Sequence, residues 1–146
     1  MSFDQHLKVA ALSKTLSPEL GWEDIRVDRA SFLGNPFEIT ATMDRDAVVE
    51  AFRQWLWEMI KLNQHNPNSK VSLQTWTQQG YTVAKRFKHP TASQVVNELK
   101  QLLQKLKAGK KIRLLCWCTP RLCHADIIVR CLIKVEHDAR LQGLLT

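Results

Sequence analysis

The sequence is poor in the features that mark several large classes of protein. It holds only five glycines, five prolines and one tyrosine among 146 residues, which excludes collagen-like and low-complexity chains. No apolar run approaches the roughly 18 residues of a membrane span, so we expect no membrane partner. The first residues lack the uninterrupted apolar core of a signal peptide. These absences predict a soluble, cytoplasmic protein.

Familiar catalytic motifs are missing as well. The chain has no phosphate loop of the Walker type, no H-E-x-x-H helix and no Ser-His-Asp order. It has four cysteines, which in a reducing compartment are expected to be thiols or metal ligands before they are disulfides. The sequence alone therefore does not decide whether the protein is an enzyme.

Basic residues are concentrated in one part of the chain. The formal net charge is +7, and residues 83–113 hold nine Lys or Arg against one acid, Glu98. A positive surface attracts phosphate-bearing molecules, which predicts a nucleotide or nucleic acid as partner. The alternative is that Lys100, Lys105 and Lys107 only form the solvated face of a helix, because no nucleic-acid-binding motif accompanies the charge.

The spacing of apolar residues predicts an α/β domain. We expect a single compact layered domain over residues 25–146, with a small, mainly parallel sheet flanked by helices. Residues 1–24 are expected to form an N-terminal helical extension, and residues 63–90 an insertion with some local structure. The expected elements are, in order, a helix within 2–16, strands at 25–27 and 37–40, a helix capped by Asp44, a helix capped by Thr91 or Ser93, a strand at 112–118 and a helix that begins near Cys123.

The candidate site is the segment LLCWCTPRLCHAD, residues 114–126, which holds three cysteines and a histidine within nine residues. The segment begins on an expected strand and ends on an expected helix. In open α/β sheets such a junction is where ligands bind, because unpaired helix N–H groups meet a crevice there. Asp126 stands three residues after Cys123, which suits a helix cap.

Three interpretations of this cluster stay open. The first is a metal site, because three cysteines and one histidine make up a tetrahedral zinc set: Cys116, Cys118, Cys123 and His124. Their spacing is unlike that of zinc knuckles. We therefore expect no cofactor, with zinc as the alternative. As a catalytic pair, Cys123 would be a nucleophile, favoured as a thiolate by the helix dipole and Arg121, and His124 an acid or base. As structural residues, the cysteines are small buried hydrophobes. A Cys118–Cys123 disulfide is not expected in a reducing cytosol.

These residues resemble a known family. The segment Cys116-Trp117-Cys118-x-Pro120 followed by Cys123-His124, the loop Gly34-Asn35-Pro36-Phe37 and the helix after Arg45 are similar to domain-of-unknown-function family 4326, which is common in bacteria and phages. The resemblance covers roughly residues 25–135; it implies a compact α/β fold and no particular activity. Ala125 stands where members usually carry Gly, and residues 63–90 have no clear counterpart. The shared residues that the resemblance implies are Arg29, Gly34, Asn35, Pro36, Phe37, Arg45, Cys116, Trp117, Cys118, Pro120, Cys123 and His124.

The two motif regions can form one pocket. If the strand at 25–27 lies beside the strand at 112–118, the loop 29–37 and the turn 119–124 open onto the same sheet edge. Free N–H groups at residues 123–125 and nearby arginines would then bind an anion, with phosphate as the expected ligand. The alternatives are a tight turn at residues 34–36, a core position for Phe37 and simple exposure of Arg45. The candidate ligand-binding residues are Arg29, Gly34, Asn35, Arg45, Arg121, Cys123 and His124.

We therefore expect an α/β domain that binds a phosphate-bearing ligand, a nucleotide or nucleic acid, at a strand-to-helix pocket. One alternative is a non-catalytic interaction module that docks on a protein partner through residues 71–90, using Trp76, Lys85, Arg86 and Lys88. The other alternative is a small structural zinc domain.

Overall fold

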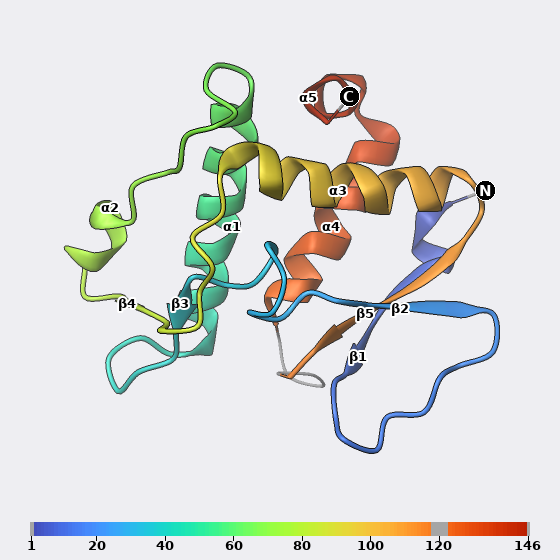
Figure 1. Cartoon of the computed structure of the whole chain (residues 1–146), viewed down its shortest axis with the longest axis horizontal. Coiled ribbons are helices and arrows are strands. Elements are labelled where there is room, and N and C mark those ends of the chain that lie inside the picture. The colour runs from blue at the N-terminus through green and yellow to red at the C-terminus, as the bar shows by residue number, and fades with distance from the viewer. Residues whose placement is uncertain (1, 118–122, 146) are drawn as a thin grey trace.

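A small parallel sheet packs against a layer of helices (Figure 1). The structure, a computed structural model, describes residues 2–117 and 123–145. Three strands run parallel in the order β1-β5-β2, and Leu114 in β5 stands between Val9 and Ile25. Two short strands form a separate antiparallel pair. The strands are β1 (Leu7–Ala11), β2 (Trp22–Arg26), β3 (Phe37–Glu38), β4 (Thr82–Val83) and β5 (Lys111–Cys116).

The two longest helices begin where polar side chains satisfy the first backbone N–H groups. Asp44 accepts a hydrogen bond from the Ala47 N–H at 2.9 Å ahead of α1, and Thr91 with Gln94 forms a reciprocal capping box ahead of α3. Both caps agree with the sequence-based expectation. The helices are α1 (Arg45–Asn63), α2 (Gln74–Thr77), α3 (Ala92–Lys107), α4 (His124–His137) and α5 (Ala139–Leu144), and a 3-10 helix, η1 (Phe3–Gln5), precedes β1.

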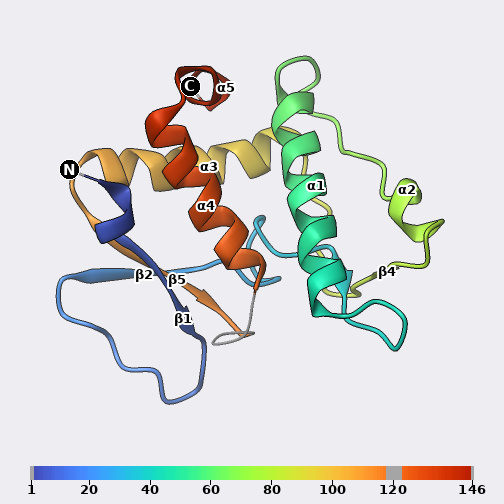
Figure 2. The ribbon, with the colours of Figure 1, turned by 180° about the vertical axis from the view of Figure 1, so that it is seen from behind.

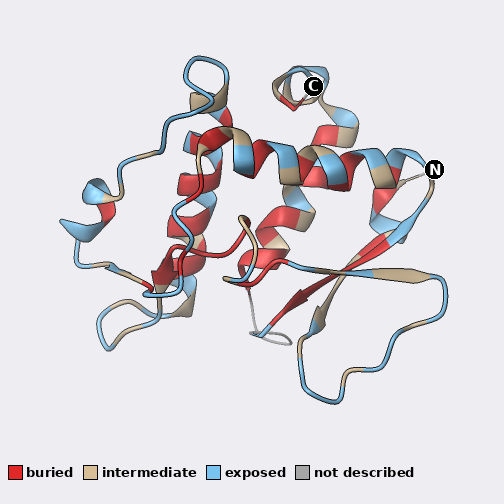
Figure 3. Ribbon diagram, in the orientation of Figure 1, coloured by how far each residue is buried: buried red, intermediate tan, exposed pale blue. Residues whose placement is uncertain are grey.

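The two faces of the sheet differ in polarity. Ile25 and Leu114 face the core, where α3 and α4 both contact β5 and α4 lies beside α1 (Figures 2 and 3). On the opposite face the Arg113 guanidinium donates to Asp24 at 2.6 and 2.8 Å and to the Ser17 carbonyl at 3.0 Å. The bond to Ser17 holds the loop between β1 and β2 against the sheet. The core therefore lies on the helical side of the sheet, as the predicted α/β layering requires.

The N-terminal segment differs from its prediction. The expected helix within residues 2–16 is wrong, because Leu7–Ala11 is a strand that pairs with the central strand β5 over its whole length. The apolar positions of this segment fit a strand as well, since Leu7 and Val9, two residues apart, both pack in the core. Short segments are ambiguous in this way until a pairing partner decides between the two structures.

The other expected elements are present with shifted ends. The strand expected at 25–27 spans Trp22–Arg26, and the one expected at 37–40 is limited to Phe37–Glu38. The strand expected at 112–118 is Lys111–Cys116, and residue 118 lies outside the described residues. Among the helices that the structure describes, none combines the length and the apolar character needed to cross a bilayer.

Candidate functional site

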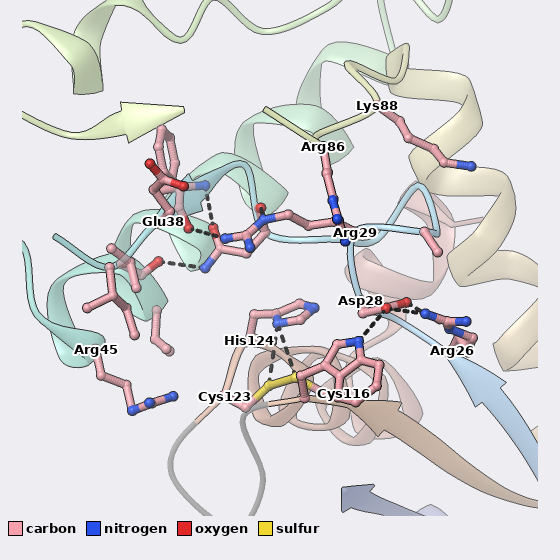
Figure 4. Close-up of a pocket in the computed structure, with 17 residues that line it drawn as sticks. Arg26, Asp28, Arg29, Glu38, Arg45, Arg86, Lys88, Cys116, Cys123 and His124 are labelled. Atoms are coloured by element: carbon pink, nitrogen blue, oxygen red, sulfur yellow. Dashed lines mark hydrogen bonds and ion pairs between the residues drawn. A yellow bond between two sulfur atoms is a disulfide. The ribbon is translucent and has the colours of Figure 1, made fainter. Parts of the chain in front are cut away.

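A cleft opens at the carboxyl ends of β2 and β5 (Figure 4). Because β2 pairs in parallel with β5, the chain leaving each strand enters the same region, and the predicted neighbourhood of these two strands is confirmed. The cleft has a volume of about 680 Å³. That volume falls within the range of small-molecule sites. Its walls come from the loop after β2, from β3, from the first turns of α1 and α4, and from the segment after β4.

Arg29 and Asn35 form the framework of one wall. The Arg29 guanidinium donates to the backbone carbonyls of Asn35 at 3.0 Å and Phe37 at 2.9 Å. The Asn35 amide accepts from the Phe37 N–H at 3.0 Å and donates to the Val48 carbonyl of α1 at 3.1 Å. Both side chains were expected to bind an anion, and both line the cleft. The Arg29 bonds, however, hold the two ends of the loop at residues 29–37 together, and the bond from Asn35 holds the loop against α1.

Gly34 contributes to the same loop by its lack of a side chain. A Cβ atom at this position would lie 2.6 Å from the Arg29 Cα and 2.8 Å from the Asp28 carbonyl oxygen, both in the backbone. Only glycine allows this close approach. Phe37, for which a core position was one alternative, is fully buried between the rings of Trp76 and Tyr81.

Cationic side chains outnumber acidic ones around the cleft. Five cationic and two acidic side chains line it, an excess of three positive charges if His124 is neutral. Arg86 and Lys88 are exposed and make no hydrogen bond or ion pair with any residue in the described part of the chain. They reach the cleft because β4 pairs with β3 and the Ala84 N–H donates to the Pro36 carbonyl at 2.8 Å.

An exposed aromatic ring stands at the edge of the cleft. The Trp117 side chain is 58% exposed, yet its indole N–H donates to the Asp28 carboxylate at 3.0 Å. The same carboxylate receives two hydrogen bonds from Arg26, at 3.1 and 2.5 Å. Burial acts to raise the pKa of Asp28, but the hydrogen bonds from Arg26 and Trp117 outweigh it and hold the pKa below its usual range. A charged anchor thus fixes the orientation of this indole.

The cysteine and histidine cluster lies on the floor of the cleft. Cys116 and Cys123 form a disulfide, so Cys123 is not a thiolate in this structure. The His124 Nε2 lies 2.5 Å from the Val27 carbonyl oxygen, and its Nδ1 faces the sulfurs of Cys123 at 3.4 Å and Cys116 at 3.8 Å. The imidazole also stacks edge-on against Phe52. Burial lowers the pKa of His124 to about 4, so the ring is neutral near neutral pH.

The start of α4 differs from the expected anion pocket. The Cys123 N–H donates to the Asp126 carboxylate at 3.0 Å, and the Ala125 N–H faces the Cys123 sulfur at 3.5 Å. These amides are buried and occupied by a capping box, as the helix-cap alternative for Asp126 anticipated. The prediction that these N–H groups are free to bind a ligand was wrong, because the acidic cap of the helix already accepts a hydrogen bond from its N-terminus.

The family model of a "Domain of unknown function (DUF4326)" matches residues 12–134. The chain belongs to the DUF4326 family. No curated protein and no solved structure matches the DUF4326 chain. The matched range includes the loop at residues 34–37, all of α1 and the cysteine and histidine cluster, so the DUF4326 match contains every described residue of the cleft.

The cleft of this DUF4326 domain gathers most of the predicted site residues. Five of them line it: Arg29, Asn35, Arg45, Cys123 and His124. Gly34 does not line the cleft, but its lack of a side chain allows the close backbone approach within the loop. The predicted ligand-binding residue Arg121 lies outside the described residues, as do Cys118 and Pro120 of the motif.

Sequence reasoning missed the Arg26–Asp28 pair of the DUF4326 cleft. An acidic residue two positions after the end of a strand, at the edge where ligands bind, is a signal that could have indicated Asp28. Trp76, which the interaction hypothesis places at a docking surface, is only 5% exposed, and its indole donates to Gln54 at 3.0 Å. Trp76 is therefore part of the core.

Proposed function

We propose that the cleft binds a nucleotide, with the phosphates held by its cationic side chains and the base stacked on Trp117. The observation that carries this proposal is the excess of positive charge in a single cleft, where Arg86 and Lys88 make no hydrogen bond or ion pair with the described residues and Lys88 only lies over the Phe32 ring, 5.8 Å from its centroid. Such side chains remain available to a ligand, unlike Arg26 and Arg29, which are engaged with the protein.

The chemistry of the remaining groups supports a phosphate-bearing ligand. A guanidinium forms two parallel hydrogen bonds with two oxygens of a phosphate, and a lysine ammonium supplies a localised positive charge. Arg86 and Lys88 together therefore suit a polyphosphate. Arg45 lines the same cleft from the first turn of α1. The charge excess also draws anions towards the cleft at low salt.

The exposed indole supports a ligand that carries an aromatic base. Base stacking on an aromatic side chain contributes about 1–3 kcal/mol, and a ring held in place loses less entropy on binding. Trp117 meets this condition because Asp28 holds its indole N–H. A bounded cleft of about 680 Å³ fits one nucleotide better than a strand of nucleic acid, which needs a groove along its backbone.

Charge reversal at Arg86 tests the proposal. We expect Arg86→Glu to weaken the binding of ATP by at least about tenfold in a calorimetric titration, because a contact is lost and a repulsion is gained. Lys85→Glu is the matched control: it makes the same charge change on the neighbouring exposed residue, which does not line the cleft. We expect this control to change the affinity by no more than about twofold at physiological salt.

Two results would contradict the proposal. One is a wild-type protein that binds neither purine nor pyrimidine nucleoside triphosphates at low salt. The other is an equal loss of affinity in Arg86→Glu and Lys85→Glu, which would indicate a general effect of net charge and no site in the cleft.

A further inference from the structure

His124 is held in one orientation with one ring nitrogen turned towards two sulfur atoms (Figure 4). Its Nε2 lies against the Val27 carbonyl, an acceptor only, so Nε2 carries the hydrogen and donates it. The neutral ring then has a lone pair on Nδ1, and that lone pair faces the sulfurs of Cys116 and Cys123. Neither sulfur of a disulfide has a hydrogen to donate to it. In the oxidised state the Nδ1 lone pair therefore faces two sulfur atoms, and neither of them donates a hydrogen bond to it.

The three side chains have the composition of a metal site. The ligand atoms of Cys116, Cys123 and His124 all lie within 4.8 Å of one another, and all three residues are buried. Thiolate sulfur and imidazole nitrogen are the ligands that Zn²⁺ prefers. Histidine ligands to zinc usually donate their other ring N–H to a backbone carbonyl or a carboxylate, and the Val27 carbonyl already has that role here.

We propose that the reduced protein binds one Zn²⁺ through the Cys116 and Cys123 sulfurs and the His124 Nδ1, and that the disulfide is the metal-free, oxidised state of the same site. The proposal concerns the floor of the cleft and does not depend on nucleotide binding. The proposal uses only the described residues, and Cys118 lies outside them.

The chemistry of the exchange balances. Two equivalents of a thiol reductant break the Cys116–Cys123 bond, giving two protein thiols and one oxidised reductant disulfide. Zn²⁺ then binds two thiolates, and two protons leave to solvent. The two negative charges neutralise the metal, which suits a buried position because an uncompensated charge there is costly. Reoxidation needs a two-electron acceptor such as the disulfide of an oxidised small thiol. By thiol–disulfide exchange it takes two electrons and two protons and becomes two thiols, the Cys116–Cys123 bond reforms, and the ion loses both thiolate ligands and is released.

Cobalt binding tests the site directly. We expect protein reduced with a phosphine to bind Co²⁺ with a thiolate charge-transfer band and the visible bands of tetrahedral geometry, and one equivalent of Zn²⁺ to displace it. The disulfide form should show neither. Cys123→Ser should weaken metal binding by at least about tenfold, a loss that even removal of a supporting hydrogen bond produces. Cys131→Ser is the matched control, because Cys131 is a free cysteine on α4 outside the cluster, and it should bind as the wild type does.

A measurement on the wild-type protein keeps the test decisive if Cys123→Ser fails to fold. Zinc K-edge absorption of the reduced, zinc-loaded chain should show scattering from sulfur together with imidazole. Oxygen and nitrogen scattering alone, or sulfur scattering without imidazole, would overturn the proposal. So would cobalt bands that survive oxidation of the protein or that Cys131→Ser abolishes.

Discussion

Asn35→Ala is expected to lower the free energy of unfolding by about 2–3 kcal/mol, because the substitution leaves a buried N–H group without an acceptor. The Asn35 side chain accepts from the Phe37 N–H and donates to the Val48 carbonyl, so it joins the loop at residues 34–37 to α1. Urea unfolding followed by circular dichroism measures the loss. Because this loop is one wall of the cleft, ligand affinity should fall in the same variant.

Asn68→Ala is the matched control for this prediction. Asn68 is exposed in the polar turn after α1, and the same truncation there should change stability by less than about 0.5 kcal/mol. Equal stability losses in the two variants would contradict the structural role of Asn35, as would an Asn35→Ala protein as stable as the wild type.

The pH dependence of stability is expected to be dominated by His124 between neutral and mildly acidic conditions. Its pKa is lowered from 6.5 to about 4 by burial, with the nearby Arg29 acting in the same direction and the Val27 carbonyl opposing it. The unfolded chain therefore takes up a proton below about pH 6.5 that the folded chain refuses. Stability is complete above that pH and falls by about 3 kcal/mol as the pH approaches 4, with about 2 kcal/mol lost by about pH 5.

This prediction applies to the oxidised protein in the presence of a chelator. Urea unfolding at a series of pH values gives the curve, and His65→Gln, which removes an exposed imidazole, should leave its slope unchanged. Asp28 does not interfere above about pH 5, because a carboxylate with a lowered pKa begins to lose its stabilising contribution only as the pH falls towards its usual value of 3.8. Constant stability between neutral pH and about pH 5 would show that His124 is not buried in neutral form.

Local sequence signals predicted the parts of the fold that local physics determines. The caps at Asp44 and Thr91 and the apolar stripes of α1 and α3 act within a few residues of the chain, and the structure has them where the sequence placed them. β1 was predicted as a helix because its identity depends on pairing with β5, about a hundred residues away. Pairing across such a distance leaves no mark in the spacing of five residues.

In the candidate site, too, some features could be predicted from the sequence, and others depend on contacts that form only on folding. The loop at residues 29–37 and the turn at residues 119–124 were predicted to open onto the same sheet edge, because parallel strands bring their carboxyl ends together. Arg29, Asn35 and Phe37 of the loop and Cys123 and His124 of the turn line one cleft, whereas residues 119–122 lie outside the described residues. The use of Arg29 and Asn35 as loop supports could not be predicted, since it depends on which carbonyls lie within reach after folding. The Arg26–Asp28–Trp117 contact also joins separate elements. The position of Asp28 after a strand could indicate this residue as part of the site, but no motif in the chain indicates its contact with Trp117.

Binding of a nucleotide in the cleft requires that the phosphates and the base are held by the same molecule. A comparison of ATP with tripolyphosphate, each titrated into the wild type and into Trp117→Leu, separates the two contributions. We predict that Trp117→Leu weakens ATP binding by about tenfold, the loss expected for one stacked base, and leaves tripolyphosphate binding unchanged. Equal affinity of the two proteins for ATP, or an equal loss of affinity for both ligands, would contradict base stacking on Trp117.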